Sequence, residues 1–213
     1  MTSTLEKPVH APKLRQTEIV LLVAAPVVLG LGRALLVPFN DQRWDHMLSN
    51  MADSPTRNAI GWSLALLAAG LLTATGLALV RLVSDRPRLA VPATIGVVTG
   101  WAGTAAIASG GLLMGDMAKN PDRKAMVDVL TGFNEGNGNT VFFMVLAGVI
   151  GNILLAVALA RGGVASKGTA ILIGAGAVIS LVGAPGPVAP VAITGAALLL
   201  AGHVQLLRGL RDR

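Results

Sequence analysis

The sequence predicts an all-α fold, a polytopic transmembrane helical bundle of about six spans with two short extracytoplasmic amphipathic helices. Three observations lead to this fold class. Hydrophobic residues make up 53% of the 213-residue chain, charged residues 13%, and the mean hydropathy is +0.68, values that a water-facing surface does not tolerate. Apolar segments recur near the length of about 20 residues that crosses a hydrocarbon core. Basic residues concentrate in alternate connections between these segments.

The six predicted spans account for most of the chain. They are residues 19–38, 58–83, 89–114, 140–160, 169–184 and 188–207. The first span follows basic residues, as the apolar core of a secretory signal would, but it is longer than the roughly 7–15 residues of such a core. We therefore interpret it as the uncleaved start of one transmembrane domain at 19–207, between cytoplasmic tails at 1–18 and 208–213.

The connection between the fifth and sixth spans has the composition of a tight turn. The sequence GAPGP at residues 183–187 breaks helix geometry, and the fifth span is the shortest of the six. We interpret this region as two spans joined by a turn. One broken, re-entrant segment is the alternative.

Lysine and arginine set the predicted orientation, because positively charged loops stay on the cytoplasmic side. Of the 17 basic residues, those that fall at the predicted cytoplasmic end are Lys7, Lys13, Arg15, Arg81, Arg86, Arg88, Arg161, Lys167, Arg208, Arg211 and Arg213. Those at the other end are Arg43, Arg57, Lys119, Arg123 and Lys124. The sequence therefore predicts a multi-pass protein of the cell membrane with both termini in the cytoplasm.

The two longer outer loops each carry the pattern of an amphipathic helix. In the first, Trp44, Met47, Leu48 and Met51 recur at i, i+3, i+4 and i+7, which places them on one helix face. In the second, the sequence NPD at 120–122 favours a helix start, and apolar residues repeat as far as residue 133. We expect both helices to lie flat on the membrane surface. Asn and Gly residues at 134–139 predict turns before the fourth span.

Arg33 is the one charged residue well inside a predicted span, near its outer end. A cation at this depth needs a partner or a route to water. We favour a structural interpretation, in which the side chain reaches the outer interface or pairs with Asp41 or Asp116. The alternative is a site for a carboxylate or a phosphate headgroup at the outer mouth of the bundle.

Asp41, Asp45 and His46 lie within six residues of one another on the first outer loop. The two carboxylates are four residues apart and could share a helix face, but His46 points about 100° away from Asp45. Zinc takes three or four convergent ligands, so we favour a solvated helix face and expect no metal site. The alternative is an acidic outer mouth that attracts cations and also includes Asp116, Asp128 and Glu135.

Asn152 is the strongest hydrogen-bonding side chain near the middle of a span. We favour a hydrogen bond to a neighbouring helix over a polar substrate path, because an amide in lipid seeks a partner. The predicted spans carry no carboxylate, which disfavours ion-coupled transport. The three histidines, at 10, 46 and 203, are not placed to face each other across a haem, and the chain has no cysteine for thiolate chemistry. We expect no cofactor.

Small residues and two tryptophans indicate how the spans pack. Gly96 and Gly100 lie one helical turn apart on the third span, which lets helix backbones approach closely. This span is therefore a candidate for the centre of the bundle or for a dimer face. Trp62 fits an aromatic belt at the outer interface, whereas Trp101 is expected inside the bundle.

The number and spacing of the spans, together with the segment VPFNDQRWD at 37–45, resemble small six-span bacterial integral membrane proteins of unknown function, particularly those of actinobacteria. The resemblance implies a membrane helical bundle. It implies no functional residues, because such families have no established activity.

The poverty of reactive groups favours a non-enzymatic accessory protein or lipid-associated bundle. Because the basic residues lie beside apolar runs, the expected partners are membrane lipids rather than nucleic acid, with a membrane protein or a second copy of the chain as further candidates. The alternative is a transporter or binding protein for a lipid-like, small hydrophobic or anionic solute. An intramembrane enzyme ranks third, and it would have to use Asp41, Asp45, His46 and Asp116.

Overall fold

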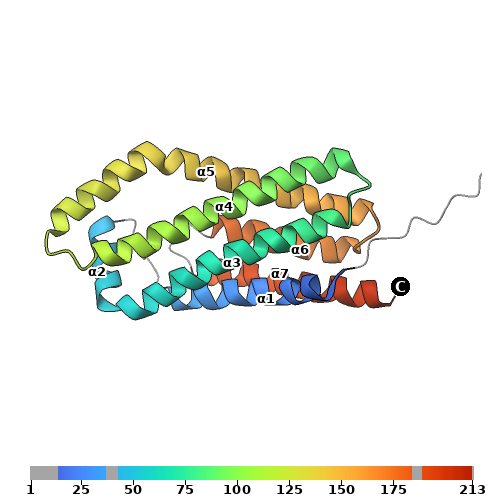
Figure 1. The fold of residues 1–213 in the computed structure, drawn as a ribbon, viewed down its shortest axis with the longest axis horizontal. Helices are drawn as coiled ribbons and strands as arrows, with labels where there is room; N and C mark the ends of the chain where they lie inside the picture. The colour runs from blue at the N-terminus through green and yellow to red at the C-terminus, as the bar shows by residue number, and fades with distance from the viewer. Residues whose placement is uncertain (1–13, 37–42, 184–188, 213) are drawn as a thin grey trace, which may run out of the picture.

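The computed structural model describes residues 14–36, 43–183 and 189–212, which form seven helices and no strand. The helices are α1 (Gln16–Leu35), α2 (Trp44–Asp53), α3 (Pro55–Arg81), α4 (Pro87–Met117), α5 (Arg123–Arg161), α6 (Lys167–Val182) and α7 (Ala189–Arg211). All but α2 run roughly along the long axis of the molecule (Figure 1). The predicted all-α helical bundle is confirmed.

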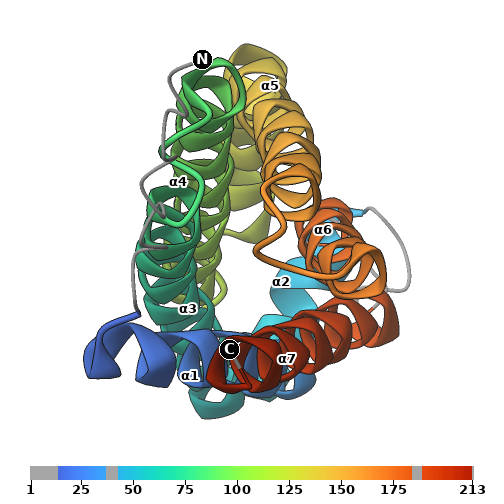
Figure 2. The same cartoon turned by 90° about the vertical axis from the view of Figure 1, so that its right-hand side faces the viewer.

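The six long helices form a closed ring in the order of the chain. Each of α1, α3, α4, α5, α6 and α7 packs against the next, and α7 returns to pack against α1 (Figure 2). Consecutive helices in the ring are antiparallel, so the bundle has two ends. We call the end where α1 begins and α7 ends the terminal end, and the end that holds α2 the opposite end.

Five helices among the described residues are long and apolar enough to cross a membrane: α1, α3, α4, α7 and the part of α5 from Gly138 to Arg161. The sixth ring helix, α6, has 16 residues and is therefore about 24 Å long. It pairs with α7 along its whole length, from Gly183 beside Ala192 to a hydrogen bond between Thr169 and Gln205. The predicted fifth and sixth segments are thus two antiparallel helices rather than one broken helix; the predicted turn at 184–188 lies outside the described residues.

Helix α5 contains the clearest departure from the sequence prediction. The turns expected at 134–139 are wrong, because the helix continues without interruption through these residues for 39 residues in all. Glycine and asparagine disfavour a helix interior by only about 1 kcal/mol per residue, and helix-forming apolar segments on both sides continue the backbone hydrogen-bond ladder through them. The predicted second amphipathic helix is therefore the first part of α5, which curves at this end of the molecule (Figure 1).

The first amphipathic helix is present as α2, and its apolar face packs on protein; its position at a membrane surface stays a prediction. Leu48 and Met51 are completely buried, and α2 packs against α3, α4 and α5. Seen along the bundle, α2 lies at the far end of the ring (Figure 2). The apolar face that the sequence pattern revealed is covered by protein, and α2 covers the ring at this end on the side of α3, α4 and α5.

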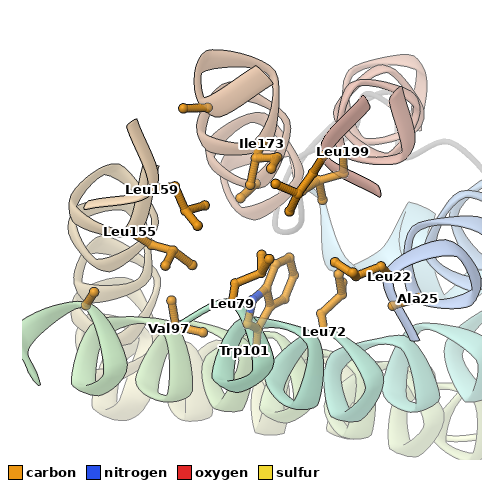
Figure 3. Close-up of a cluster of buried hydrophobic side chains, with 14 of the residues drawn as sticks. Leu22, Ala25, Leu72, Leu79, Val97, Trp101, Leu155, Leu159, Ile173 and Leu199 are labelled. Atoms are coloured by element: carbon orange, nitrogen blue, oxygen red, sulfur yellow. The ribbon is translucent and has the colours of Figure 1, made fainter. Parts of the chain in front are cut away.

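Side chains from all six ring helices fill the interior. Leu22, Leu72, Trp101, Leu155, Ile173 and Leu199 belong to one buried cluster and point inward from their helices (Figure 3). The expected interior position of Trp101 is confirmed, with 2% of its surface exposed. Large apolar residues also cover the outside of the ring, for example Val20, Ile95 and Ile171. Such an outer surface suits lipid, because every ring helix presents apolar side chains to both sides.

Glycine allows the tightest helix contact of the ring, between α4 and α5. A Cβ atom added to Gly96 would lie 2.5 Å from the Cα atom of Gly151, and one added to Gly100 would meet the backbone of Gly148. The sequence-based expectation that Gly96 and Gly100 permit close backbone approach is thus confirmed, and the partner is a helix of the same chain.

This contact predicts opposite effects for two alanine substitutions on α4. Gly100→Ala forces the helices apart and should lower the free energy of unfolding by about 1–3 kcal/mol. Gly110→Ala, at a position with open space around the added Cβ, should raise it by about 0.5–1 kcal/mol, because alanine is the better helix former. Reversible unfolding in mixed detergent micelles measures both. Equal effects of the two variants would contradict the packing described.

Candidate functional site

A proline in α1 creates the central polar contact of the ring. Pro26 has no backbone N–H, so the carbonyl group of Leu22 lacks the donor that residue i+4 normally supplies. The Nδ1 atom of His203 on α7 lies 2.7 Å from the Leu22 oxygen. Because a carbonyl only accepts, Nδ1 carries the proton and donates it. His203 therefore replaces the missing helix donor and ties α7 to α1.

Thr75 on α3 approaches the same part of α1. Its hydroxyl oxygen lies 2.8 Å from the Leu71 oxygen in its own helix and 3.3 Å from the Leu21 oxygen of α1. The hydroxyl donates to its own helix and lies beside the turn of α1 that contains Pro26. Side chains from two neighbouring helices thus surround the α1 backbone where Pro26 interrupts it, which is how membrane helices accommodate proline.

A small cavity lies inside the ring beside these groups. Its lining includes the polar side chains of Thr75, Asn152 and His203, the indole of Trp101, and the apolar side chains of Leu72, Leu155, Ile173 and Leu199. Thr75, Asn152 and His203 are 2%, 6% and 1% exposed, so all three are interior groups. The cavity has room for about one water molecule.

The structure places Asn152 in this interior but gives its amide a different bond from the expected one. The Nδ2 atom donates to the Gly148 oxygen at 2.8 Å, within α5 itself. We expected a hydrogen bond to a neighbouring helix, but this N–H group bonds within its own helix. Gly148 is also the residue that meets Gly100 of α4, so the amide bond lies next to the tightest helix contact.

Arg33 lies at the opposite end of the ring and does not reach the surface. It is 5% exposed, and its guanidinium carbon lies 6.0 Å from the centre of the Trp62 ring, a distance typical of a cation–π contact. Trp62 is 4% exposed and would collide with any side chain at Gly111, so its expected place in a lipid-facing aromatic belt is wrong. It packs in the same cluster as Leu48 and Met51 of α2. The expected extension of Arg33 to the interface is also wrong, because the side chain is buried beside Trp62.

Asp116 is not the partner of Arg33. Its carboxylate binds the ammonium group of Lys119 at 2.7 Å, and its side chain is 76% exposed. Asp41, the other expected partner, lies outside the described residues. Asp128 and Glu135 are exposed on α5.

The predicted Asp45 and His46 pair lies on the exposed side of α2. Arg43 binds Asp45 at 2.9 Å, and the hydrogen bond from its guanidinium holds the pKa of Asp45 below the usual value. The Nε2 atom of His46 is 3.8 Å from the Asp45 carboxylate. Within the described ranges, no three histidine or acidic side chains come together as metal ligands. For Asp45 and His46 the geometry is that of a solvated helix face.

Two polar contacts at the ends of α1 were missed by sequence reasoning. At the terminal end, Glu18 accepts from Arg81 at 2.6 Å and from the backbone N–H of Arg15 at 2.7 Å. At the opposite end, the Arg57 Nε atom donates to the Leu35 oxygen at 2.8 Å. An acid in the first helical turn was the available signal for Glu18. No local signal existed for Arg57, which caps a helix that ends 22 residues earlier.

No protein family, no curated protein and no solved structure matches this chain. The chemistry of the site therefore rests on its own geometry. His203, Thr75 and Asn152 each hydrogen-bond to a backbone carbonyl, so each of these buried polar groups has a partner in the fold.

The substitution of Pro26 provides a test of the role assigned to His203. His203→Leu should lower the free energy of unfolding by about 1–3 kcal/mol, because it leaves the buried Leu22 carbonyl without a donor. In a Pro26→Ala background the restored N–H binds that carbonyl, so the same substitution should cost about 1 kcal/mol less. Unfolding of the two single variants and the double variant measures this coupling.

Thr94→Val is the matched control for this cycle. The Thr94 hydroxyl binds the Ala90 oxygen in its own helix, far from α1, and its loss should be independent of Pro26→Ala. If the effects of His203→Leu and Pro26→Ala on the free energy of unfolding are additive, His203 does not compensate for the donor missing at Pro26.

Proposed function

We propose that this chain is a non-enzymatic membrane protein that acts by association, as an accessory subunit or a lipid-associated helical bundle. The observation that carries the proposal is the filled interior of the ring. Side chains from six helices meet at its centre, and the cavity described there has room for about one water molecule. A carrier of a lipid-like or anionic solute needs a larger polar cavity open to one side of the membrane.

The position of the polar groups supports the same proposal. The buried His203, Thr75 and Asn152 bind helix carbonyls, and Arg33 is enclosed beside Trp62. Each of these groups has a structural partner in the fold. The alternative transporter would have to open the ring to use Arg33 or Asn152 as a binding group.

Charge supports an orientation and a lipid partner. At the terminal end the described basic residues are Arg15, Arg81, Arg86, Arg88, Arg161, Lys167, Arg208 and Arg211, and the described acids are Glu18, Asp85 and Asp212. At the opposite end, acidic residues are as numerous as basic ones. We propose that the terminal end faces the cytoplasm of the cell membrane, so that both termini are cytoplasmic and the basic residues meet anionic headgroups.

Single cysteines provide a direct test of this orientation, because the chain has none of its own. Ser49 on α2 and Ser84 between α3 and α4 are exposed at opposite ends of the bundle. A membrane-impermeant maleimide should label Ser49→Cys in intact cells and Ser84→Cys only after permeabilisation. Ser84 suits this purpose better than Ser166, whose hydroxyl caps α6. The reverse labelling pattern would overturn the orientation.

Native mass spectrometry of the protein in membrane-derived nanodiscs tests the functional class. A protein partner in fixed stoichiometry, a second copy of the chain or retained anionic phospholipid would support association. A bound solute that is lost in Asn152→Ala but kept in the lipid-facing control Ser109→Ala would contradict the proposal and support the transporter.

A further inference from the structure

The cavity inside the ring is lined by three polar side chains whose hydrogen-bonding capacity the surrounding protein uses only in part. His203 is the least exposed of the three polar side chains on the cavity, with 1% of its surface exposed. Its Nδ1 proton is committed to the Leu22 carbonyl, so in the neutral ring Nε2 is an acceptor. Among the described residues, Leu22 is the one hydrogen-bond partner of this imidazole. A buried acceptor without a donor costs about 1–3 kcal/mol. A molecule in the cavity that donates a hydrogen bond to Nε2 would remove this cost.

Asn152 and Thr75 offer the complementary groups on the same cavity. Asn152 uses one N–H on the Gly148 carbonyl, which leaves its second N–H and the lone pairs of its side-chain oxygen. Thr75 uses its single O–H on the Leu71 carbonyl, which leaves its oxygen as an acceptor. Both residues line the cavity together with His203. The lining therefore contains donors and acceptors that one small, bifunctional molecule could satisfy.

The size of the cavity limits which molecule can bind in it. A site that holds water needs space for about one molecule and two to four polar partners, whereas purely apolar cavities stay dry. This cavity meets both conditions through Thr75, Asn152 and His203. A phospholipid headgroup, a metabolite or a hydrated ion is too large for it.

We propose that the cavity binds one ordered water molecule, which donates to Nε2 of His203 and hydrogen-bonds to Asn152. The water joins α7 to α5, two helices that are not neighbours in the ring. Together with the bond from His203 to Leu22, it completes a chain of hydrogen bonds from α1 through α7 to α5. The ring is then held across its centre as well as around its rim. This inference is independent of the proposed association.

Solid-state nuclear magnetic resonance of the full-length protein in phospholipid bilayers tests the site, with ¹⁵N-labelled histidine. The chain has three histidines, so the buried ring is readily assigned. The Nε2 resonance of His203 should show a hydrogen-bonded shift and a magnetisation-transfer peak from water. A shift typical of a free acceptor, with no transfer from water, would overturn the proposal.

Two substitutions on α5 separate the water from other causes of the signal. Asn152→Leu replaces the polar side chain with an apolar one of similar size. The Nε2 resonance of His203 should then move to the free-acceptor position, while its Nδ1 resonance stays in place. Asn139→Leu, on the exposed part of the same helix, should change neither resonance. An Nε2 resonance that is unchanged in Asn152→Leu would overturn the assigned geometry.

Ala177→Val provides a second measurement if Asn152→Leu fails to fold. Ala177 lines the cavity, and added methyl groups there displace its contents without removing a polar residue. If the cavity holds water, displacement leaves Nε2 of His203 without a donor, so the midpoint of unfolding should fall. A rise in the midpoint, as expected when a dry void is filled, would overturn the proposal.

Discussion

Close approach of helix backbones at glycine is the contact on which the rest of this structure depends. In a lipid environment no hydrophobic force drives one apolar helix against another, so association relies on van der Waals contact and a few hydrogen bonds. Gly96 and Gly100 of α4 meet Gly148 and Gly151 of α5 with no space for a side chain between them. Similar contacts recur between α1 and α3 and between α6 and α7. They bring the helices close enough to close the ring and fill its centre.

The proline inside α1 is tolerated because the ring closes around it. Pro26 removes the backbone donor of the Leu22 carbonyl in the interior of the ring, and the cost is avoided because α7 lies beside α1 and brings His203 to that carbonyl. His203 therefore takes the place of a backbone donor of α1, and Thr75 bonds within its own helix, so neither is assigned a reactive role. The buried polar residues thus have a structural role, and their presence in the core does not require an enzymatic one. It also places the polar cavity where the ring interior is already most polar.

The two ends of the bundle differ in what they present. At the terminal end, basic side chains surround the helix ends and the Glu18–Arg81 pair joins α1 to α3. At the opposite end, α2 packs in the same cluster as Trp62, and α5 extends beyond the other helices (Figure 1). A closed interior between two different ends favours a protein that works through its surfaces. The association with lipids or proteins proposed above follows from this arrangement.

The sequence by itself determined that the protein is helical, which segments are apolar and at which end the basic residues lie. These properties follow from hydropathy, from the 3.6-residue period and from charge, which are local and are read from neighbouring residues. The tertiary structure decided that α2 is buried, that Trp62 packs on Gly111, and that α5 continues through 134–139. It also decided that His203 binds the carbonyl left free by Pro26, a contact between residues 181 positions apart. Such pairings depend on which helices become neighbours, and a single sequence does not contain that information in any local pattern.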